Sequence, residues 1–212
     1  MKLRIVVAAL AVAALCSCAG ARATGTPKVV ERPEWGGHFK AAGVTGTIAL
    51  KKQGDARVQV FDATRAATPY LPASTFKIPN SCIALQTGAV SGPGEVFKWD
   101  GAPRSVAAWN RDMTLAEAFA ASNVPVFQEI ARRIGAERMA LYVAEARYGN
   151  ADIGGGIDRF WLEGALRISA LGQIEFLERL RNGGTPFARQ TVDTVATMML
   201  VDKEIGRASC RE

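Results

Sequence analysis

The sequence has few of the side chains that bind metals or form disulfides. Its 212 residues include one histidine, His38, and four cysteines, none of them in a Cys-x-x-Cys pair. A structural zinc site needs about four closely spaced cysteine or histidine ligands, so we expect no metal cluster. Three cysteines lie near the chain ends, which leaves Cys82 as the single cysteine of the body. It has no partner there for a disulfide, and we expect it to be a small buried residue.

The body of the chain also lacks an excess of charge of one sign. The formal net charge is +6, of which residues 1–23 account for +3 and residues 205–212 for +1, leaving +2 for the rest. A nucleic-acid-binding surface needs a strongly basic patch, so we expect no nucleic-acid partner. Hydrophobic residues make up 49% of the sequence, which is enough for one domain with a substantial core.

The N-terminus has the pattern of an export signal. Two basic residues precede an apolar run over residues 5–15, which is too short to span a bilayer as a stable anchor. We predict a signal peptide over residues 1–23, ending in a small-x-small cleavage site, with residues 19–21 as a second choice. The protein would then be periplasmic or secreted. Residues 15–18 also resemble a lipoprotein box, so lipid anchoring at Cys18 stays the alternative.

The last eight residues, 205–212, differ in character from the rest. They show no hydrophobic periodicity, include Cys210, and resemble the translation of a common sequencing adapter. We expect them to be a non-native tail after a partial domain over residues 24–204. Sequencing the parent gene beyond the codon for Glu204 tests this, because a natural frame that ends at Glu212 contradicts it.

Hydrophobic patterning predicts a hairpin followed by a block of helices. Residues 46–52 and 57–62 alternate as two strands, and a two-stranded hairpin is not stable alone, so it should join a larger sheet. The predicted helices cover residues 74–88, 115–121, 125–134, 136–147, 169–181 and 189–201. We also expect an extended lead-in over residues 24–42, a loop over residues 91–111 and a kink at Pro79.

A serine and a lysine lie three residues apart at the start of the first predicted helix. At this spacing Ser74 and Lys77 share one helix face. A serine hydroxyl needs a base to become a nucleophile, and a lysine can serve when burial suppresses its charge. The pair therefore indicates a Ser/Lys site for covalent catalysis. Taken alone, the pattern is also expected about once by chance in a chain of this length, with Ser74 as a helix N-cap.

Three further motifs follow in the chain. Ser122-Asn123-Val124 lies between two predicted helices, Tyr148-Gly149-Asn150 ends a helix, and Trp161-Leu162 follows within one loop. Each has an ordinary structural explanation when it stands alone: a helix cap, a C-terminal glycine and a core residue. Together with the Ser-x-x-Lys pair, and in this order, they resemble the class D β-lactamases, the oxacillinase family of serine β-lactamases.

The resemblance runs from about Gly46 to Glu204 and implies a fold. We expect an α/β (α+β) protein of the serine β-lactamase and penicillin-binding transpeptidase-like fold, with a helical lobe against an antiparallel sheet. The family's Lys-Thr/Ser-Gly strand, which supplies an oxyanion donor, has no counterpart in the sequence. Loss of one such donor typically costs about 10²–10³ in rate. We therefore expect the C-terminal strands of the sheet to be missing, this chain to be poorly folded and inactive, and its full-length parent to be an active β-lactamase.

The resemblance also implies roles for the motif residues. Ser74 would attack the β-lactam carbonyl, Lys77 would carry CO2 as N6-carboxylysine and act as general base, and Ser122 would pass a proton to the lactam nitrogen. The expected binding and supporting residues are Phe76, Val124, Tyr148, Asn150, Trp161 and Leu162. No cofactor besides CO2 or bicarbonate is implied, the partner is a small-molecule β-lactam, and a homodimer stays open.

Three other functions stay open. A β-lactam sensor domain shares this fold and lysine, but it is acylated without turnover and normally follows several membrane spans instead of a cleavable signal. A penicillin-binding transpeptidase lacks the pairing of Tyr-Gly-Asn with the tryptophan, and its activity would not depend on bicarbonate. A non-enzymatic exported binding protein would keep its function after Ser74→Ala.

Overall fold

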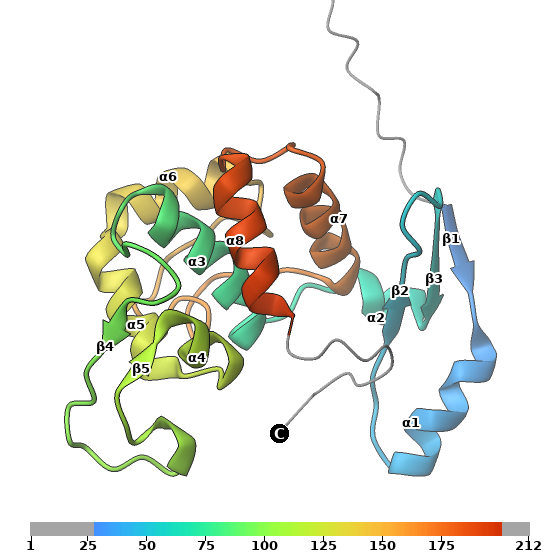
Figure 1. The fold of residues 1–212 in the computed structure, drawn as a ribbon. Coiled ribbons are helices and arrows are strands. Elements are labelled where there is room, and N and C mark those ends of the chain that lie inside the picture. The colour runs from blue at the N-terminus through green and yellow to red at the C-terminus, as the bar shows by residue number, and fades with distance from the viewer. Residues whose placement is uncertain (1–27, 201–212) are drawn as a thin grey trace, which may run out of the picture.

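The computed structural model describes residues 28–200 of the chain. The predicted signal peptide, the alternative lipid site at Cys18 and the predicted tail over residues 205–212 lie outside the described residues. Figure 1 shows a helical lobe with a small sheet to one side of it. Within residues 28–200, no helix combines the length and the apolar character that crossing a membrane requires.

The small sheet contains strands β1 (Lys28–Glu31), β2 (Ile48–Leu50) and β3 (Arg57–Phe61), in the order β1-β3-β2. β2 and β3 pair antiparallel, with Ile48 opposite Phe61, which confirms the predicted hairpin. β1 pairs with β3 in parallel, with Lys28 opposite Arg57. Hydrophobic patterning does not predict β1, which the segment before the hairpin contributes as a third strand.

The prediction of an extended lead-in over residues 24–42 is wrong for its second half. A 3-10 helix covers Pro33–Trp35, and helix α1 covers Gly36–Ala42. Pro33 stands at the start of the 3-10 helix, where its missing N–H has no partner to lose. Gly43 ends α1 with a φ of 66°, a left-handed conformation that glycine adopts at little cost.

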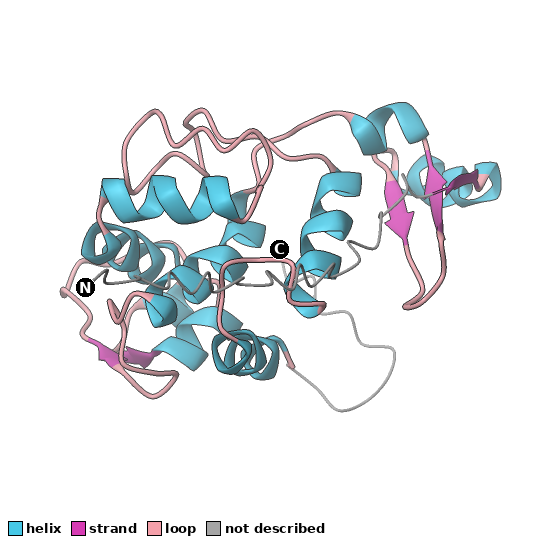
Figure 2. Cartoon of the chain, turned by 90° about the horizontal axis from the view of Figure 1, so that it is seen from above, coloured by secondary structure: helices cyan, strands magenta, loops and turns pink. Residues whose placement is uncertain are grey.

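Helices form the larger lobe (Figure 2). They are α3 (Lys77–Gln86), α4 (Leu115–Ala120), α5 (Val124–Ile134), α6 (Ala136–Glu145), α7 (Ala170–Arg181) and α8 (Arg189–Met199). The short helix α2 (Ala63–Ala67) lies beside the sheet instead. The predicted helices from residue 115 onward are confirmed. Thr114 begins α4 in a capping box with Glu117, and Asn123 and Ser169 accept first-turn N–H groups of α5 and α7.

Two predictions near these helices need correction. Pro79 does not kink α3, because α3 begins at Lys77 and Pro79 lies in its first turn, where backbone N–H groups have no partner inside the helix. The residues before it form a 3-10 helix over Ala73–Phe76. The predicted loop over residues 91–111 includes strand β4 (Val96–Phe97), which pairs antiparallel with β5 (Met113–Thr114), and a 3-10 helix over Ala107–Trp109.

The core of the helical lobe is built around α3. Cys82 and Ile83 on α3 are fully buried, as are Ile130 on α5 and Val195 on α8. The prediction that Cys82 is a buried residue is therefore confirmed. Burial in apolar surroundings raises the pKa of its thiol to about 12, which keeps the thiol protonated and unreactive at neutral pH.

The sheet has a small core of its own. Val58, Val60 and Ala66 are buried there, and α7 packs against this cluster. The link between sheet and helical lobe is reinforced by an ion pair in which Lys51 Nζ lies 2.6 Å from Glu178 Oε2.

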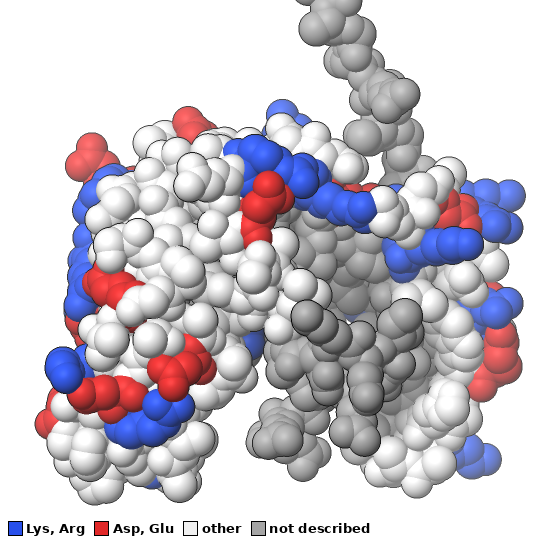
Figure 3. Space-filling view, viewed as in Figure 1, with Lys and Arg blue, Asp and Glu red and all other residues white. Residues whose placement is uncertain are grey.

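Surface charge is mixed. Figure 3 shows basic and acidic side chains interspersed over one face of the molecule. Several form ion pairs, such as Lys98 with Asp112 at 2.6 Å and Arg111 with Glu117 at 2.9 Å. Exposed pairs of this kind contribute little to stability, because water screens them. Lys98 follows β4 and Asp112 precedes β5, so the first of these pairs joins the two ends of the connection between the strands.

Candidate active site

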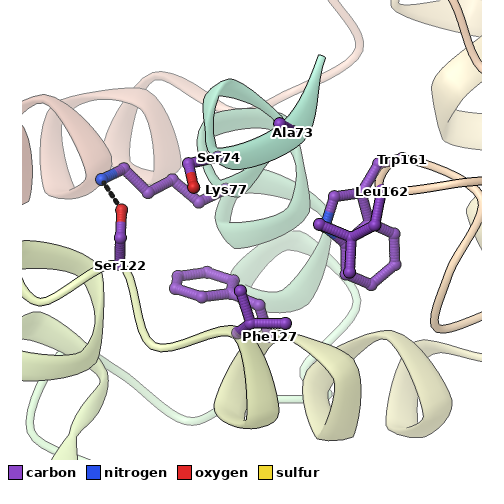
Figure 4. A pocket seen from close by; sticks show the side chains of 8 residues that line it. Ala73, Ser74, Lys77, Ser122, Phe127, Trp161 and Leu162 are labelled. Atoms are coloured by element: carbon purple, nitrogen blue, oxygen red, sulfur yellow. Dashed lines mark hydrogen bonds between the residues drawn. The ribbon is translucent and has the colours of Figure 1, made fainter. Parts of the chain in front are cut away.

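Ser74 and Lys77 lie where a 3-10 helix passes into α3. Residues three apart eclipse each other in a 3-10 helix, so the two side chains lie on one face (Figure 4). Ser74 is exposed and Lys77 is half-buried. Ala73, directly before Ser74, has a φ of 45°, which residues other than glycine rarely adopt. Its backbone N–H donates to the carbonyl of Trp161 at 3.0 Å, which holds this strained turn in place.

The amino group of Lys77 is turned toward Ser122. Its Nζ donates to Ser122 Oγ at 2.7 Å and to the backbone carbonyl of Phe119 at 3.1 Å. Burial lowers the pKa of Lys77 below its ordinary value, because the charged form loses contact with water. The structure therefore places a lysine with a lowered pKa in hydrogen-bond contact with Ser122, and Ser74 lines the same cavity.

Ser122 is projected into the site by the junction between α4 and α5. Ala121 ends α4, and Asn123 begins α5 as a buried N-cap whose Oδ1 accepts from Val126 N–H at 3.2 Å. Between them Ser122 adopts a φ of 50°. A positive φ costs a serine roughly 1–2 kcal/mol, so it persists only where the surrounding structure fixes it. The two helices thus direct this hydroxyl to Lys77, 45 residues earlier in the chain.

These side chains border a small cavity. Its lining comprises Ala73, Ser74, Lys77, Ser122, Val124, Phe127, Trp161 and Leu162. All three predicted catalytic residues and three of the predicted supporting residues are among them. The cavity has a volume of about 10 Å³, room for about one water-sized sphere. The sequence prediction misses Phe127, although it follows Val124 by three residues on α5 and so shares its face.

Trp161 lies across the cavity from Lys77 (Figure 4). Its indole nitrogen is on the cavity side, and no acceptor within residues 28–200 takes its N–H. Phe76 stacks on the Trp161 ring with the ring centroids 5.4 Å apart. Phe76 is one of the predicted supporting residues, but it is fully buried behind the turn and does not line the cavity. It therefore supports Trp161 and the Ser74 turn from the buried side, away from the cavity.

Tyr148 and Asn150 also lie outside the cavity lining. Tyr148 is fully buried, and this burial raises the pKa of its phenol to about 12. Asn150 Nδ2 donates to the carbonyl of Ala165 at 2.9 Å, and Asn150 Oδ1 accepts from Arg167 N–H at 2.9 Å. The Tyr-Gly-Asn motif thus braces the loop that carries Trp161 and has no direct contact with the cavity.

The chain is similar to known proteins in both sequence and structure. Residues 44–209 match the penicillin binding protein transpeptidase domain family. The chain is 51% identical over 152 residues to β-lactamase OXA-10 of Pseudomonas aeruginosa, and 42% identical over 172 residues to OXA-48 of Klebsiella pneumoniae. The crystal structure of a class D β-lactamase, YbXI from Nostoc, matches with a TM-score of 0.76 and 40% identity, over 79% of this chain and 71% of that chain. The chain belongs to the class D β-lactamase family.

Membership in the class D family confirms the predicted resemblance and fold class. The matches cover 72% and 81% of this chain, but 57% and 65% of OXA-10 and OXA-48. The chain therefore spans about three fifths of the length of these curated relatives. Within residues 28–200, no three His, Cys, Asp or Glu side chains are grouped to hold a metal ion.

Proposed function

We propose that the full-length protein hydrolyses β-lactam antibiotics through a serine acyl-enzyme. One observation carries this proposal: Lys77 Nζ lies 2.7 Å from Ser122 Oγ. Lys77 shares its helix face with Ser74, and the chain is a member of the class D family. A half-buried lysine with a lowered pKa can accept a proton, and an exposed serine can reach a substrate.

The geometry suits a sequence of proton transfers. Ser74 Oγ attacks the lactam carbonyl carbon and gives up its proton to the base at Lys77. The tetrahedral oxyanion is stabilised by the Ser74 backbone N–H, which lies in the first turn of a helix. Ser122 then passes a proton to the lactam nitrogen as the C–N bond breaks, and Lys77 returns one to Ser122. Water activated at the same base releases the product and restores Ser74.

The residues around Lys77 also fit the carboxylated form. Carboxylation requires a neutral amine, which burial favours at Lys77. Val124 and Leu162 make the surroundings apolar, and the indole N–H of Trp161, which has no acceptor within residues 28–200, is a donor for an added carboxylate. Bound CO2 would supply a carbamate oxygen as general base at this position. A carbamate signal in the ¹³C NMR spectrum after addition of ¹³C-bicarbonate, absent in Lys77→Met, tests this without an activity assay.

The test of function uses the protein expressed from the complete parent reading frame. Wild-type protein incubated with a penicillin should gain the mass of the drug and then lose it as product forms. Ser74→Ala should form no adduct and lose about 10⁴-fold or more in turnover, because the nucleophile is gone. Ser105→Ala is the matched control, since Ser105 is exposed and does not line the cavity.

The outcomes separate the competing functions. A stable adduct without turnover assigns the protein as a β-lactam sensor. Turnover that does not respond to bicarbonate favours a transpeptidase-type mechanism. Wild-type protein that forms no adduct at all contradicts the proposal, as does Ser74→Ala with unchanged activity.

We also propose export to the periplasm, supported by the basic, apolar and small-residue pattern of residues 1–23. Cell fractionation and the intact mass of the mature protein test it. A chain that begins at Thr24 supports signal cleavage, and a lipid on Cys18 supports the anchored form.

Light scattering of the same sample decides whether the protein is a homodimer.

A further inference from the structure

We propose that Gln173, on α7, is a positioning residue for the Ser74 nucleophile and acts through Thr75; this inference rests on the proposed acyl-enzyme function. Gln173 belongs to none of the sequence motifs and does not line the cavity. Its Nε2 donates to Thr75 Oγ1 at 2.6 Å and to the Tyr148 hydroxyl at 2.8 Å. The amide thus links Tyr148 to the residue that follows the nucleophile.

The arrangement matches the hydrogen-bonding capacity of an amide. Thr75 Oγ1 donates its one proton to the carbonyl of Pro72 at 2.7 Å, so it can only accept from a further partner. The amide nitrogen of Gln173 has two N–H groups, and each meets one hydroxyl oxygen. A carboxylate of the same shape has no N–H: it can accept from the Tyr148 hydroxyl, but it would compete with Pro72 for the Thr75 proton and so loses the link to Thr75.

Thr75 controls the turn that carries the nucleophile. Both its hydroxyl and its backbone N–H donate to the carbonyl of Pro72, at 2.7 and 3.0 Å, and so close the chain around Ala73 and Ser74. The φ of 45° at Ala73 is strained, and such a conformation persists only where its neighbours determine it. Fixing Thr75 from outside therefore fixes the direction of the Ser74 hydroxyl.

The N-terminus of α7 is a firm support for Gln173 because it is anchored separately. Ser169 caps α7 by accepting from Gly172 N–H at 3.0 Å. Directly before the cap, Ile168 exchanges two backbone hydrogen bonds of 2.9 Å with Tyr70. The segment before the nucleophile turn and the start of α7 are therefore paired independently of the hydrogen bond between Gln173 and Thr75.

Tyr148 gives the amide a rigid second partner. Its ring is fully buried and meets Phe76 and Phe176 edge-on, with centroids 5.7 and 4.8 Å apart. Because its phenol keeps its proton at neutral pH, the hydroxyl oxygen stays a neutral acceptor for Gln173. One N–H of the amide is thus fixed to the core, and the other holds Thr75.

The experiment compares Gln173→Ala and Gln173→Glu with wild-type protein from the complete parent reading frame. The measured quantities are the acylation rate constant with a fluorescent penicillin, its non-covalent dissociation constant before acylation, and the Tm. Gln190→Ala is the matched control, because Gln190 is exposed on α8 and its side chain forms no hydrogen bond with the described residues. Thr75→Ser and Thr75→Val test the link to the turn.

We expect both Gln173 variants to acylate about 10–100-fold more slowly, with the dissociation constant changed less than about 3-fold, because a displacement of about 1 Å misaligns a nucleophile without removing a binding contact. Thr75→Ser keeps the hydroxyl and should stay close to the wild-type rate. Thr75→Val removes both the link to Gln173 and the hydroxyl bond to Pro72, so it should acylate at least as slowly as Gln173→Ala. Adding Gln173→Ala to Thr75→Val should change the rate little, because the link is already broken.

Wild-type acylation rates in both Gln173 variants overturn the inference. So does a rate loss that only follows the loss of folded protein, which the Tm and the near-isosteric Gln173→Glu variant reveal. Failure of the proposed function looks different, because then the wild-type protein itself forms no adduct.

Discussion

Lys77 is placed where its chemistry and the stability of the fold conflict. Its side chain is half-buried, and the loss of water lowers its pKa from the ordinary value of 10.5. Lys77 donates two hydrogen bonds, to Ser122 and to Phe119, and its pKa is lowered by burial nonetheless. A depressed lysine pKa favours the proton acceptor that acylation needs, and it makes the protonated form costly to bury.

We predict that Lys77→Met abolishes acylation and raises the Tm. The unfolded chain binds more protons than the folded one between the lowered pKa and 10.5, so the stability of the wild type rises with pH across this window. The stability gain of the Lys77→Met variant should therefore be largest below the lowered pKa and shrink toward pH 10.5. Thermal melts across pH in bicarbonate-free buffer measure it. Lys40→Met is the control, because Lys40 is exposed, and its free energy of unfolding should stay within about 0.5 kcal/mol of the wild type.

A Lys77→Met variant that melts below wild type at every pH contradicts this account. The backbone carbonyl of Phe119 is not left unpaired in the variant, because it also accepts from Ser122 N–H at 3.2 Å. A lower Tm would therefore mean that the lysine stabilises the fold more through its hydrogen bonds than it costs through burial.

The segment between α6 and α7 has no long helix or strand, yet its backbone is closely fixed. Asn150 bonds to Ala165 and Arg167 at one end of the loop, and Ala165 N–H donates to Gly154 O at 2.9 Å. These bonds satisfy backbone groups that a free loop would leave to water. Because Trp161 belongs to this loop, its position in the cavity depends on the bonds at the loop base.

Gly149 is the position where this loop should tolerate substitution least. It has a φ of 58°, and a Cβ there would overlap the backbone carbonyl of Arg167. Gly183 has a φ of 75° but open space around it, so Gly183→Ala should cost only the roughly 1–2 kcal/mol of the left-handed conformation. We predict that Gly149→Ala lowers the free energy of unfolding by clearly more, measured by urea denaturation. Equal losses of unfolding free energy in the two variants would show that the loop shifts to accommodate the added Cβ.

The molecule as a whole has two cores of very different size. The helical lobe buries large side chains from α3 to α8, such as Phe76, Ile130 and Phe176. The sheet buries only a small cluster of Val58, Val60 and Ala66. Leu50 on β2 remains 53% exposed, so one edge of the hairpin contributes little apolar burial. Because burial of apolar area is the main stabilising term, the two lobes should differ in stability.

For the 212-residue chain, which is expected to be poorly folded, we predict that the residual hydrogen-exchange protection is lower in β2 and β3 than in α3 and α5. Strand amides that open without disturbing a large core exchange through local unfolding, whereas α3 opens only with the whole helical lobe. Hydrogen–deuterium exchange with mass spectrometry measures this peptide by peptide. Equal protection in both lobes would show that the sheet unfolds together with the helices and that α2 and α7 couple them fully.

Local signals in the sequence are enough to predict most of the helices and the Ser/Lys pair. The caps at Thr114, Asn123 and Ser169 set helix starts, and the three-residue spacing of Ser74 and Lys77 puts both on one face. Such signals can be read from sequence because caps and spacing act within one or two helical turns.

Which distant segments meet is visible only in the folded molecule. There β1 pairs with β3 in parallel, Ser122 reaches Lys77, and Gln173 contacts Thr75, 98 residues away. Such contacts form when buried faces of several elements pack at once, so no short stretch of sequence carries their signal.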